Sequence, residues 1–109
     1  LSRRRGCVVA MTGAIDRICA GDEVVCVANG DAWMASVVGT GCMAASVVGA
    51  FAAVAGDLRE AAVLGLAWFG VAAEQAARCA GDSWTFRNRL FSAVAALYPD
   101  IHAPALRVS

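Results

Sequence analysis

The sequence predicts an α/β protein that makes up only part of a larger domain. A short buried strand and hairpins come first in the chain, and three helical stretches follow. Hydrophobic residues make up 60% of the 109 positions, glycine excluded, whereas globular proteins average about 45–50% with glycine included. One strand with hairpins cannot cover both faces of such helices. We therefore expect residues 1–109 to form a single partial domain, the C-terminal portion of a larger α/β domain.

The strand region begins with the apolar run Cys7–Gly13. A short continuous apolar run that ends in glycine is typical of a strand buried on both faces, as in a mostly parallel sheet. The pair Gly21-Asp22 then separates two further apolar runs, residues 17–20 and 23–27. A two-residue loop that starts with glycine predicts a hairpin between them.

A second hairpin signal follows at Asn29-Gly30. It predicts another short strand over Asp31–Met34. These short strands stand between the first strand and the glycine-rich turn Val37–Cys42.

The glycine-rich turn leads into an uncharged helix predicted over Met43–Ala55. Gly39 and Gly41 let the backbone turn tightly and approach a ligand closely. The free N–H groups and positive dipole end of the helix favour an anion there, commonly phosphate. Cys42, in the first turn, would face the same place. A short Gly-x-Gly sequence is also common as a plain turn, so this alternative stays open. The helix itself is small and apolar on every side, which predicts that protein encloses it.

A second helix is predicted from the capping box at Asp57 to about Cys79. In such a box Asp57 accepts from the N–H of Glu60, and the Glu60 side chain reaches back. Glu74 and Arg78 are spaced as a favourable i,i+4 pair on the exposed end.

The third helix is predicted to be capped by Ser83 and stopped by Pro99, after a left-handed turn at Gly81. Its apolar residues repeat at helical spacing: Phe86, Leu90, Phe91, Val94 and Leu97. The tail after it shows no periodicity and is expected to wrap the surface.

Charge and cysteine content restrict the function classes. The net charge is zero and the nine basic residues are all Arg, with no basic stripe, so we expect no nucleic-acid partner. The cluster Arg3–Arg5 is expected to be a solvated end. Five cysteines without a CxxC pair argue against a disulfide framework or a metal site. We expect small buried thiols in a reducing compartment, the cytoplasm.

A membrane-associated helical protein is the competing class. The stretch Ala32–Gly56 carries no charged side chain and is long enough to cross a bilayer. Gly39 and Gly41 interrupt it, however, and the remainder has the length of a buried core helix. We therefore expect no membrane partner.

The joint spacing of several motifs resembles the hydroxyethylthiazole kinase family of thiamine salvage, within the ribokinase-like superfamily. The matching motifs are Val9–Gly13 with Asp16, Ala28–Gly30, Val38–Cys42, Gly70–Ala77 and Gly81–Phe86. The resemblance runs from about Cys7 to Tyr98 and concerns the C-terminal part of the family.

This resemblance implies a kinase that moves the γ-phosphoryl group of ATP, with Mg²⁺, to the hydroxyethyl group of the thiazole. Gly39, Thr40 and Gly41 fall on its anion hole, and Gly39 also on a backbone contact to the thiazole. Cys42 falls on the catalytic base and Thr12 on a contact to the ATP phosphates. The family resemblance also implies a homotrimer with active sites at subunit boundaries.

Two departures from the family pattern leave an alternative open. Val38 stands where the family commonly has Thr, which removes a hydroxyl beside the anion hole. The N-terminal part of the family, with its Mg²⁺-organising acids, is also absent from these residues. The alternative is a truncated, non-catalytic relative that keeps the fold and the phosphate-binding turn.

Overall fold

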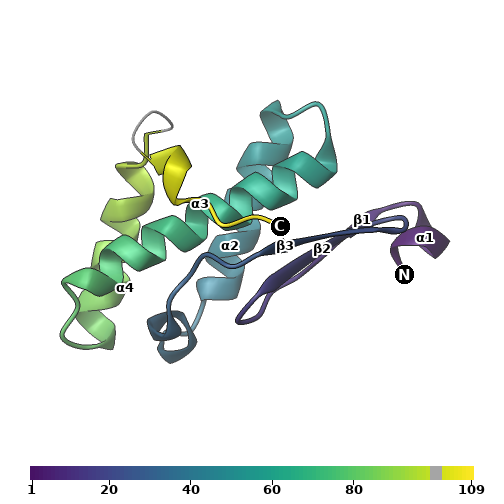
Figure 1. The fold of residues 1–109 in the computed structure, drawn as a ribbon. Coiled ribbons are helices and arrows are strands. Elements are labelled where there is room, and N and C mark those ends of the chain that lie inside the picture. The colour runs from purple at the N-terminus through teal and green to yellow at the C-terminus, as the bar shows by residue number, and fades with distance from the viewer. Residues whose placement is uncertain (99–101) are drawn as a thin grey trace.

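A three-stranded antiparallel sheet packs beside a set of helices in the computed structural model, which describes residues 1–98 and 102–109 (Figure 1). The strands are β1 (Val8–Met11), β2 (Asp16–Ala20) and β3 (Glu23–Val27), in the order β1-β2-β3. Ala20 pairs with Glu23 across the β2–β3 turn, which confirms the hairpin at Gly21-Asp22. Gly21 has φ +63°, a left-handed conformation that glycine adopts without strain.

The expectation of a first strand buried on both faces of a parallel sheet is wrong. β1 is antiparallel to β2, and its residues are half-buried or exposed. Because α3 (Leu58–Arg78) packs mainly on β2 and β3, apolar residues of the edge strand β1 remain accessible. The buried apolar residues of the sheet are Ile18 and Val27.

The predicted strand over Asp31–Met34 is also wrong. Residues Ala32–Ser36 form the 3₁₀ helix η1. The Asp31 carboxylate caps it by accepting from the Trp33 N–H at 2.9 Å. An Asp or Asn side chain that bonds nearby backbone competes with strand pairing in this way.

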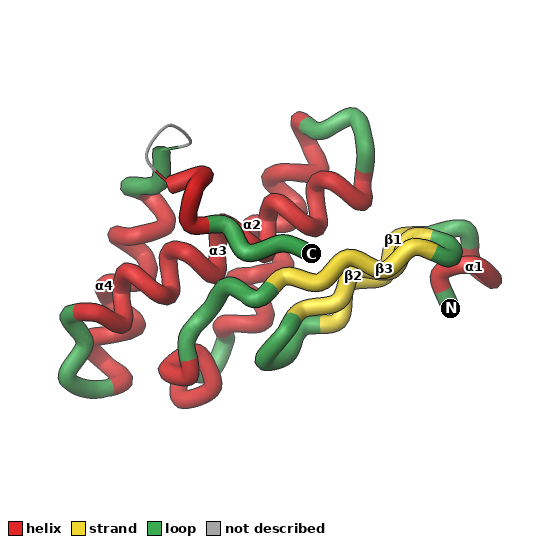
Figure 2. The backbone as a smooth tube through the Cα atoms, viewed as in Figure 1, coloured by secondary structure: helices red, strands yellow, loops and turns green. Residues whose placement is uncertain are grey.

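Helix α3 is the centre of the fold. It lies between α2 (Thr40–Val54), α4 (Ser83–Ala95) and the sheet (Figures 1 and 2). Small residues on several of its faces are buried, Ala61, Ala67 and Ala72 among them. The core joins α3 to Phe86 and Leu90 of α4 and to Ile18 and Val27 of the sheet.

Helix α2 begins at Thr40, earlier than the predicted Met43, and it is not enclosed by protein. All its residues are described, and Ala44 alone is buried. The main partner of α2 is α3, which lies along one side of it. The opposite side of α2 is therefore apolar and exposed, where the sequence predicted enclosure.

Asp57 caps α3, as predicted, but its hydrogen bond differs from the predicted one. The Asp57 carboxylate accepts from Arg59 N at 2.8 Å, not from Glu60 as a capping box requires. At the other end α3 stops at Arg78, and the Ala80 N–H donates to Ala77 O at 3.2 Å. Gly81 is absent from the residues with positive φ, so the predicted left-handed closure is wrong.

The cap of α4 is Asp82, one residue before the predicted Ser83. Its carboxylate accepts from the Thr85 N–H and the Thr85 hydroxyl, each at 2.7 Å. These bonds, the backbone one first, lower the pKa of Asp82. The helix ends at Ala95, and the predicted stop at Pro99 lies outside the described residues.

The C-terminal residues extend the sheet, which the sequence pattern did not predict. After the 3₁₀ helix η2 (Ala103–Ala105), the tail runs beside β3 (Figure 2). Cys26 and Ser109 exchange two backbone hydrogen bonds of 2.8 Å, and the Ala28 N–H donates to Arg107 O at 2.9 Å. Backbone pairing of this kind does not require apolar and polar side chains to alternate, so the periodicity of the sequence does not predict it.

The expectation that all five cysteines are buried is wrong. Cys7, Cys42 and Cys79 are exposed, and Cys19 and Cys26 are partly buried. Cys19 follows the buried Ile18 on β2, so it points to the face of the sheet away from α3.

The N-terminal arginines lie in the short helix α1 (Ser2–Arg5) and are exposed, as expected of a solvated end. Arg3 pairs with Asp22 at 2.6 Å on the surface. Among the described residues, no helix combines the length and the apolar character needed to span a bilayer.

Candidate functional site

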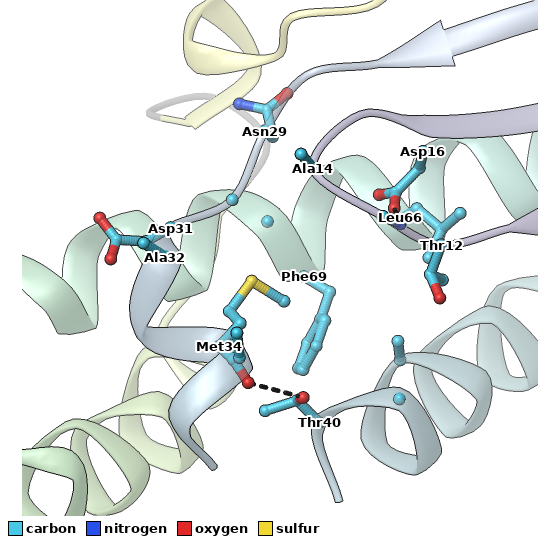
Figure 3. A pocket seen from close by; sticks show the side chains of 16 residues that line it. Thr12, Ala14, Asp16, Asn29, Asp31, Ala32, Met34, Thr40, Leu66 and Phe69 are labelled. Atoms are coloured by element: carbon cyan, nitrogen blue, oxygen red, sulfur yellow. Dashed lines mark hydrogen bonds between the residues drawn. The ribbon is translucent and has the colours of Figure 1, made fainter. Parts of the chain in front are cut away.

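A cavity of about 580 Å³ opens between the sheet, η1 and the start of α2 (Figure 3). Three loops form its rim: the β1–β2 turn with Thr12 and Gly13, the Asn29–Asp31 loop after β3, and the glycine turn with Thr40 and Gly41. Leu66 and Phe69 of α3 form its apolar inner wall. The cavity therefore gathers the segments in which the sequence motifs lie.

The glycine turn is fixed to η1 by one hydroxyl group. Thr40 Oγ1 donates to Met34 O at 3.0 Å, the dashed bond in Figure 3. Gly39 stands at the N-cap of α2 with φ +100°, where a side chain would be strained. The first backbone bond of the helix runs from Met43 N to Gly39 O at 2.9 Å. The N–H groups of the preceding first turn have no partner within the helix and can bind an anion.

The β1–β2 turn is organised by Asp16. Its carboxylate accepts from the Gly13 N–H at 3.0 Å, and the residue is only 9% exposed. Burial raises the pKa of Asp16, while the bond from Gly13 acts in the opposite direction. Asp16 thereby holds the backbone beside Thr12 at the rim of the cavity.

The predicted site residues divide into two groups. Thr12, Thr40 and Gly41 line the cavity together, whereas Gly39 and Cys42 are not among its lining residues. Cys42 is exposed in the first turn of α2. Gly41 and Ala44 face the cavity at helical i,i+3 spacing, which turns the intervening Cys42 away from it.

Sequence reasoning missed a polar cluster at one wall of the cavity: Asn29, Gly30, Glu74 and Arg107. The predicted pair between Glu74 and Arg78 is wrong, because Glu74 pairs with Arg107 of the tail. The Glu74 side chain is 18% exposed, not solvated as expected. The i,i+4 spacing predicts Arg78 as a local partner of Glu74. The fold instead brings Arg107 of the distant tail to Glu74.

Mg²⁺, implied by the family resemblance, finds no set of ligands in the part of the chain that the structure describes. Among the described residues, no group of three or more His, Cys, Asp or Glu side chains is placed to hold a metal ion.

A helix start with a glycine turn, set beside a cavity of an α/β fold, is the arrangement with which many α/β proteins bind phosphate groups. Residues 1–100 match the model of the "Hydroxyethylthiazole kinase family". The chain therefore belongs to the hydroxyethylthiazole kinase family.

Individual relatives agree with this membership. The chain is 46% identical over 107 residues to "Hydroxyethylthiazole kinase" of Methanoculleus marisnigri, covering 98% of this chain and 38% of that protein. It is 48% identical over 96 residues to the same-named protein of Rubrobacter xylanophilus, covering 87% of this chain and 36% of that one.

A solved structure confirms the fold. The hydroxyethylthiazole kinase protein from Pyrococcus horikoshii OT3 superposes with a TM-score of 0.91 at 32% identity, over 99% of this chain and 42% of that one. The chain thus spans well under half the length of the relatives it matches. The α/β class and its place as part of a larger kinase fold are as predicted.

Proposed function

We propose that this chain is the C-terminal part of an enzyme that transfers the γ-phosphoryl group of ATP to the hydroxyethyl group of 4-methyl-5-(2-hydroxyethyl)thiazole, in thiamine salvage. The observation that carries the proposal is the family match over residues 1–100, which includes the glycine turn Gly39–Cys42 at the start of α2.

Gly39, Thr40 and Gly41 act as the anion hole in this proposal. Phosphoryl transfer depends on positioning and on stabilising the charge of the transferring group. Unpaired N–H groups at the helix start offer both, since they are fixed in place before the reaction. The bond from Thr40 to Met34 supports the assignment because it holds the turn rigidly against η1.

Cys42 is the proposed base that accepts the proton of the substrate hydroxyl. It lies in the first turn of α2, where the helix dipole favours negative charge. Since Cys42 is exposed, we place the thiazole between Cys42, the backbone of Gly39 and a surface that this chain does not provide. A homotrimer with active sites at subunit boundaries would supply such a surface.

The cavity is the proposed place of ATP, with its phosphates toward Thr12 and the glycine turn. The support is the shared lining by Thr12, Thr40 and Gly41, together with the apolar wall formed by Leu66 and Phe69. Mg²⁺ would accompany ATP in this proposal, held by ligands outside the described residues. We further propose a cytoplasmic location, consistent with five free cysteines.

The alternative is a non-catalytic relative that keeps the fold and the phosphate-binding turn. It is favoured by one departure from the family pattern, Val38 in place of the Thr that is common beside the anion hole. The two proposals differ in whether residues 1–109 can complete an active enzyme.

A chimera separates the two proposals. In the M. marisnigri kinase, the segment that aligns with 107 residues of this chain is replaced by this chain. We expect thiazole-dependent formation of ADP from ATP and Mg²⁺. Changing Cys42→Ala should lower kcat by about 100-fold or more, the usual effect of losing a general base. Cys79→Ala, another exposed cysteine that does not line the cavity, is the matched control and should leave kcat unchanged.

A folded chimera without turnover would favour the non-catalytic relative. Full activity of the Cys42→Ala chimera would refute Cys42 as the base and leave the proposed kinase function standing.

A further inference from the structure

The Asn29–Gly30 loop forms one wall of the cavity, between the end of β3 and η1. Gly30 has φ +140°, a conformation that other residues rarely adopt. A loop with such a backbone needs contacts from elsewhere to keep a single conformation.

The side chain of Asn29 provides some of these contacts. It is 5% exposed, and it points away from the cavity toward the C-terminal segment (Figure 3). Asn29 Nδ2 donates to Ala105 O at 2.8 Å, and its Oδ1 accepts from the Arg107 N–H at 2.6 Å. Because these polar atoms are already paired, the side chain holds the loop in place and is not free for a ligand.

Glu74 provides the remaining contacts from α3. Its Oε1 accepts from the Gly30 N–H at 2.9 Å and from Asn29 Nδ2 at 3.2 Å. The Arg107 guanidinium donates to the same oxygen and also to Ala28 O, at 2.9 Å. One carboxylate oxygen therefore joins α3 to the loop and to the tail with charge-assisted bonds.

A glycine one turn earlier on α3 allows this approach. A Cβ at Gly70 would lie 2.6 Å from the backbone C and O atoms of Asn29, closer than any real contact. Gly70 and Glu74 lie on one face of the helix at i,i+4 spacing. The helix backbone touches the loop at Gly70, and the carboxylate reaches it at Glu74.

We propose that Glu74 is a positioning residue, held by Arg107, that fixes the Asn29–Gly30 wall of the cavity in the conformation that binds the nucleotide. This rests on the proposed function to the extent that ATP occupies the cavity. Without the carboxylate, the Gly30 N–H and the buried Asn29 amide lose an acceptor. The loop then has to move, and the cavity changes shape.

The chimera described above is suited to the test, with Glu74→Ala and Glu74→Gln as the variants. Gln keeps an oxygen acceptor at the position of Oε1. Glu60→Ala removes an exposed carboxylate from the same helix and is the matched control. Hydrogen exchange of a peptide spanning Asn29–Gly30 reports on the loop, and the Kd for ATP reports on the cavity.

We expect Glu74→Ala to lose the exchange protection of the loop and to raise the Kd for ATP by about 10- to 100-fold, the equivalent of one hydrogen bond to a charged group. Glu74→Gln should keep most of the loop protection and most of the ATP affinity. Glu60→Ala should match the unsubstituted chimera in both measurements. The kcat at saturating ATP should change less than about threefold, because Glu74 acts on binding rather than on the reacting atoms.

Unchanged loop protection in Glu74→Ala would overturn the inference. Lost protection with an unchanged Kd for ATP would overturn it as well, since the loop would then not shape the nucleotide site. A chimera that binds ATP without turnover would refute the proposed function instead, and the Glu74 variants would still be judged by Kd and by exchange.

Discussion

At the scale of single residues, Asp16 combines a nearly buried carboxylate with a hydrogen bond to the backbone of the cavity rim. The residue starts β2, pairs with Val27 and lines the cavity. Its carboxylate is nearly buried, which penalises the charged form, while the Gly13 N–H favours that form. Burial is the larger effect, so the pKa of Asp16 is raised.

This raised pKa predicts a pH dependence for Asp16→Asn, which keeps an oxygen acceptor for Gly13 but carries no charge. Asp16 ionises above its ordinary value of 3.8 in the folded state, so the folded state binds this proton more tightly than the unfolded state. Wild-type stability relative to Asp16→Asn must then fall as pH rises from 3.8 through the raised pKa. Melting temperatures of the chimera with Asp16 and of the same chimera with Asp16→Asn, taken between pH 3 and pH 7, measure this difference in stability.

The exposed Asp22→Asn serves as the control in the same series. A difference between wild type and Asp16→Asn that stayed constant, or that grew in favour of wild type with rising pH, would contradict the assignment.

At the scale of elements, the packing of α2 on α3 depends on one close contact. A Cβ at Gly65 would lie 2.9 Å from Val48 Cα and 3.0 Å from Val48 Cγ2. The nearest of these atoms is backbone, which cannot rotate aside as the end of a flexible side chain does. The absence of a side chain at Gly65 therefore sets how closely the two helices approach.

We expect Gly65→Ala to lower the free energy of unfolding by about 1–3 kcal/mol, as overpacking of a close contact does. Gly49→Ala is the matched helical control, because a Cβ there meets nothing within 4 Å. It should raise stability by about 0.5–1 kcal/mol through helix propensity. Urea unfolding of the chimera with each substitution measures the change in the free energy of unfolding. Equal effects of the two substitutions would refute the close-contact argument.

At the scale of the whole molecule, apolar surface remains uncovered. Val38, Val54 and Leu58 are exposed around the two ends of α2, and the sheet is covered by α3 on one face. Large exposed apolar patches mark surfaces that bind other protein. This agrees with a chain that spans 38% of the M. marisnigri kinase.

We therefore predict that residues 1–109 alone aggregate or form a molten state, with dye binding to exposed apolar surface and a broad thermal transition. The chimera should melt more sharply and bind less dye, because the remaining protein covers these surfaces. A sharp two-state melt of the isolated chain would show the prediction wrong.

Local chemistry explains what sequence reasoning predicted correctly. The Gly21-Asp22 hairpin, the start of α3 after Asp57 and the family membership each depend on neighbouring residues or on fixed motif spacing. The hairpin and helix signals are complete within a few positions, and the family signal is a fixed spacing of such short motifs. The glycine turn at Gly39–Gly41 belongs with them, since Gly39 has the positive φ that the tight turn requires.

The remaining features were decided by contacts between distant parts of the chain. Glu74 pairs with Arg107 rather than Arg78, and the tail pairs with β3. The 3₁₀ helix after Asp31 is the exception, because the bond from the Trp33 N–H to the Asp31 carboxylate is local, although the sequence pattern predicted a strand there.

Burial likewise depends on which surfaces meet: β1 is an edge strand and α2 packs mainly on α3, so both apolar sequences stay partly exposed. The sequence by itself determined the Gly21-Asp22 hairpin, the three long helices, the glycine turn and the family, because these follow from local conformation and spacing. The tertiary structure decided the partners of Glu74, the walls of the cavity and the exposure of Cys42, because each depends on residues far apart in sequence.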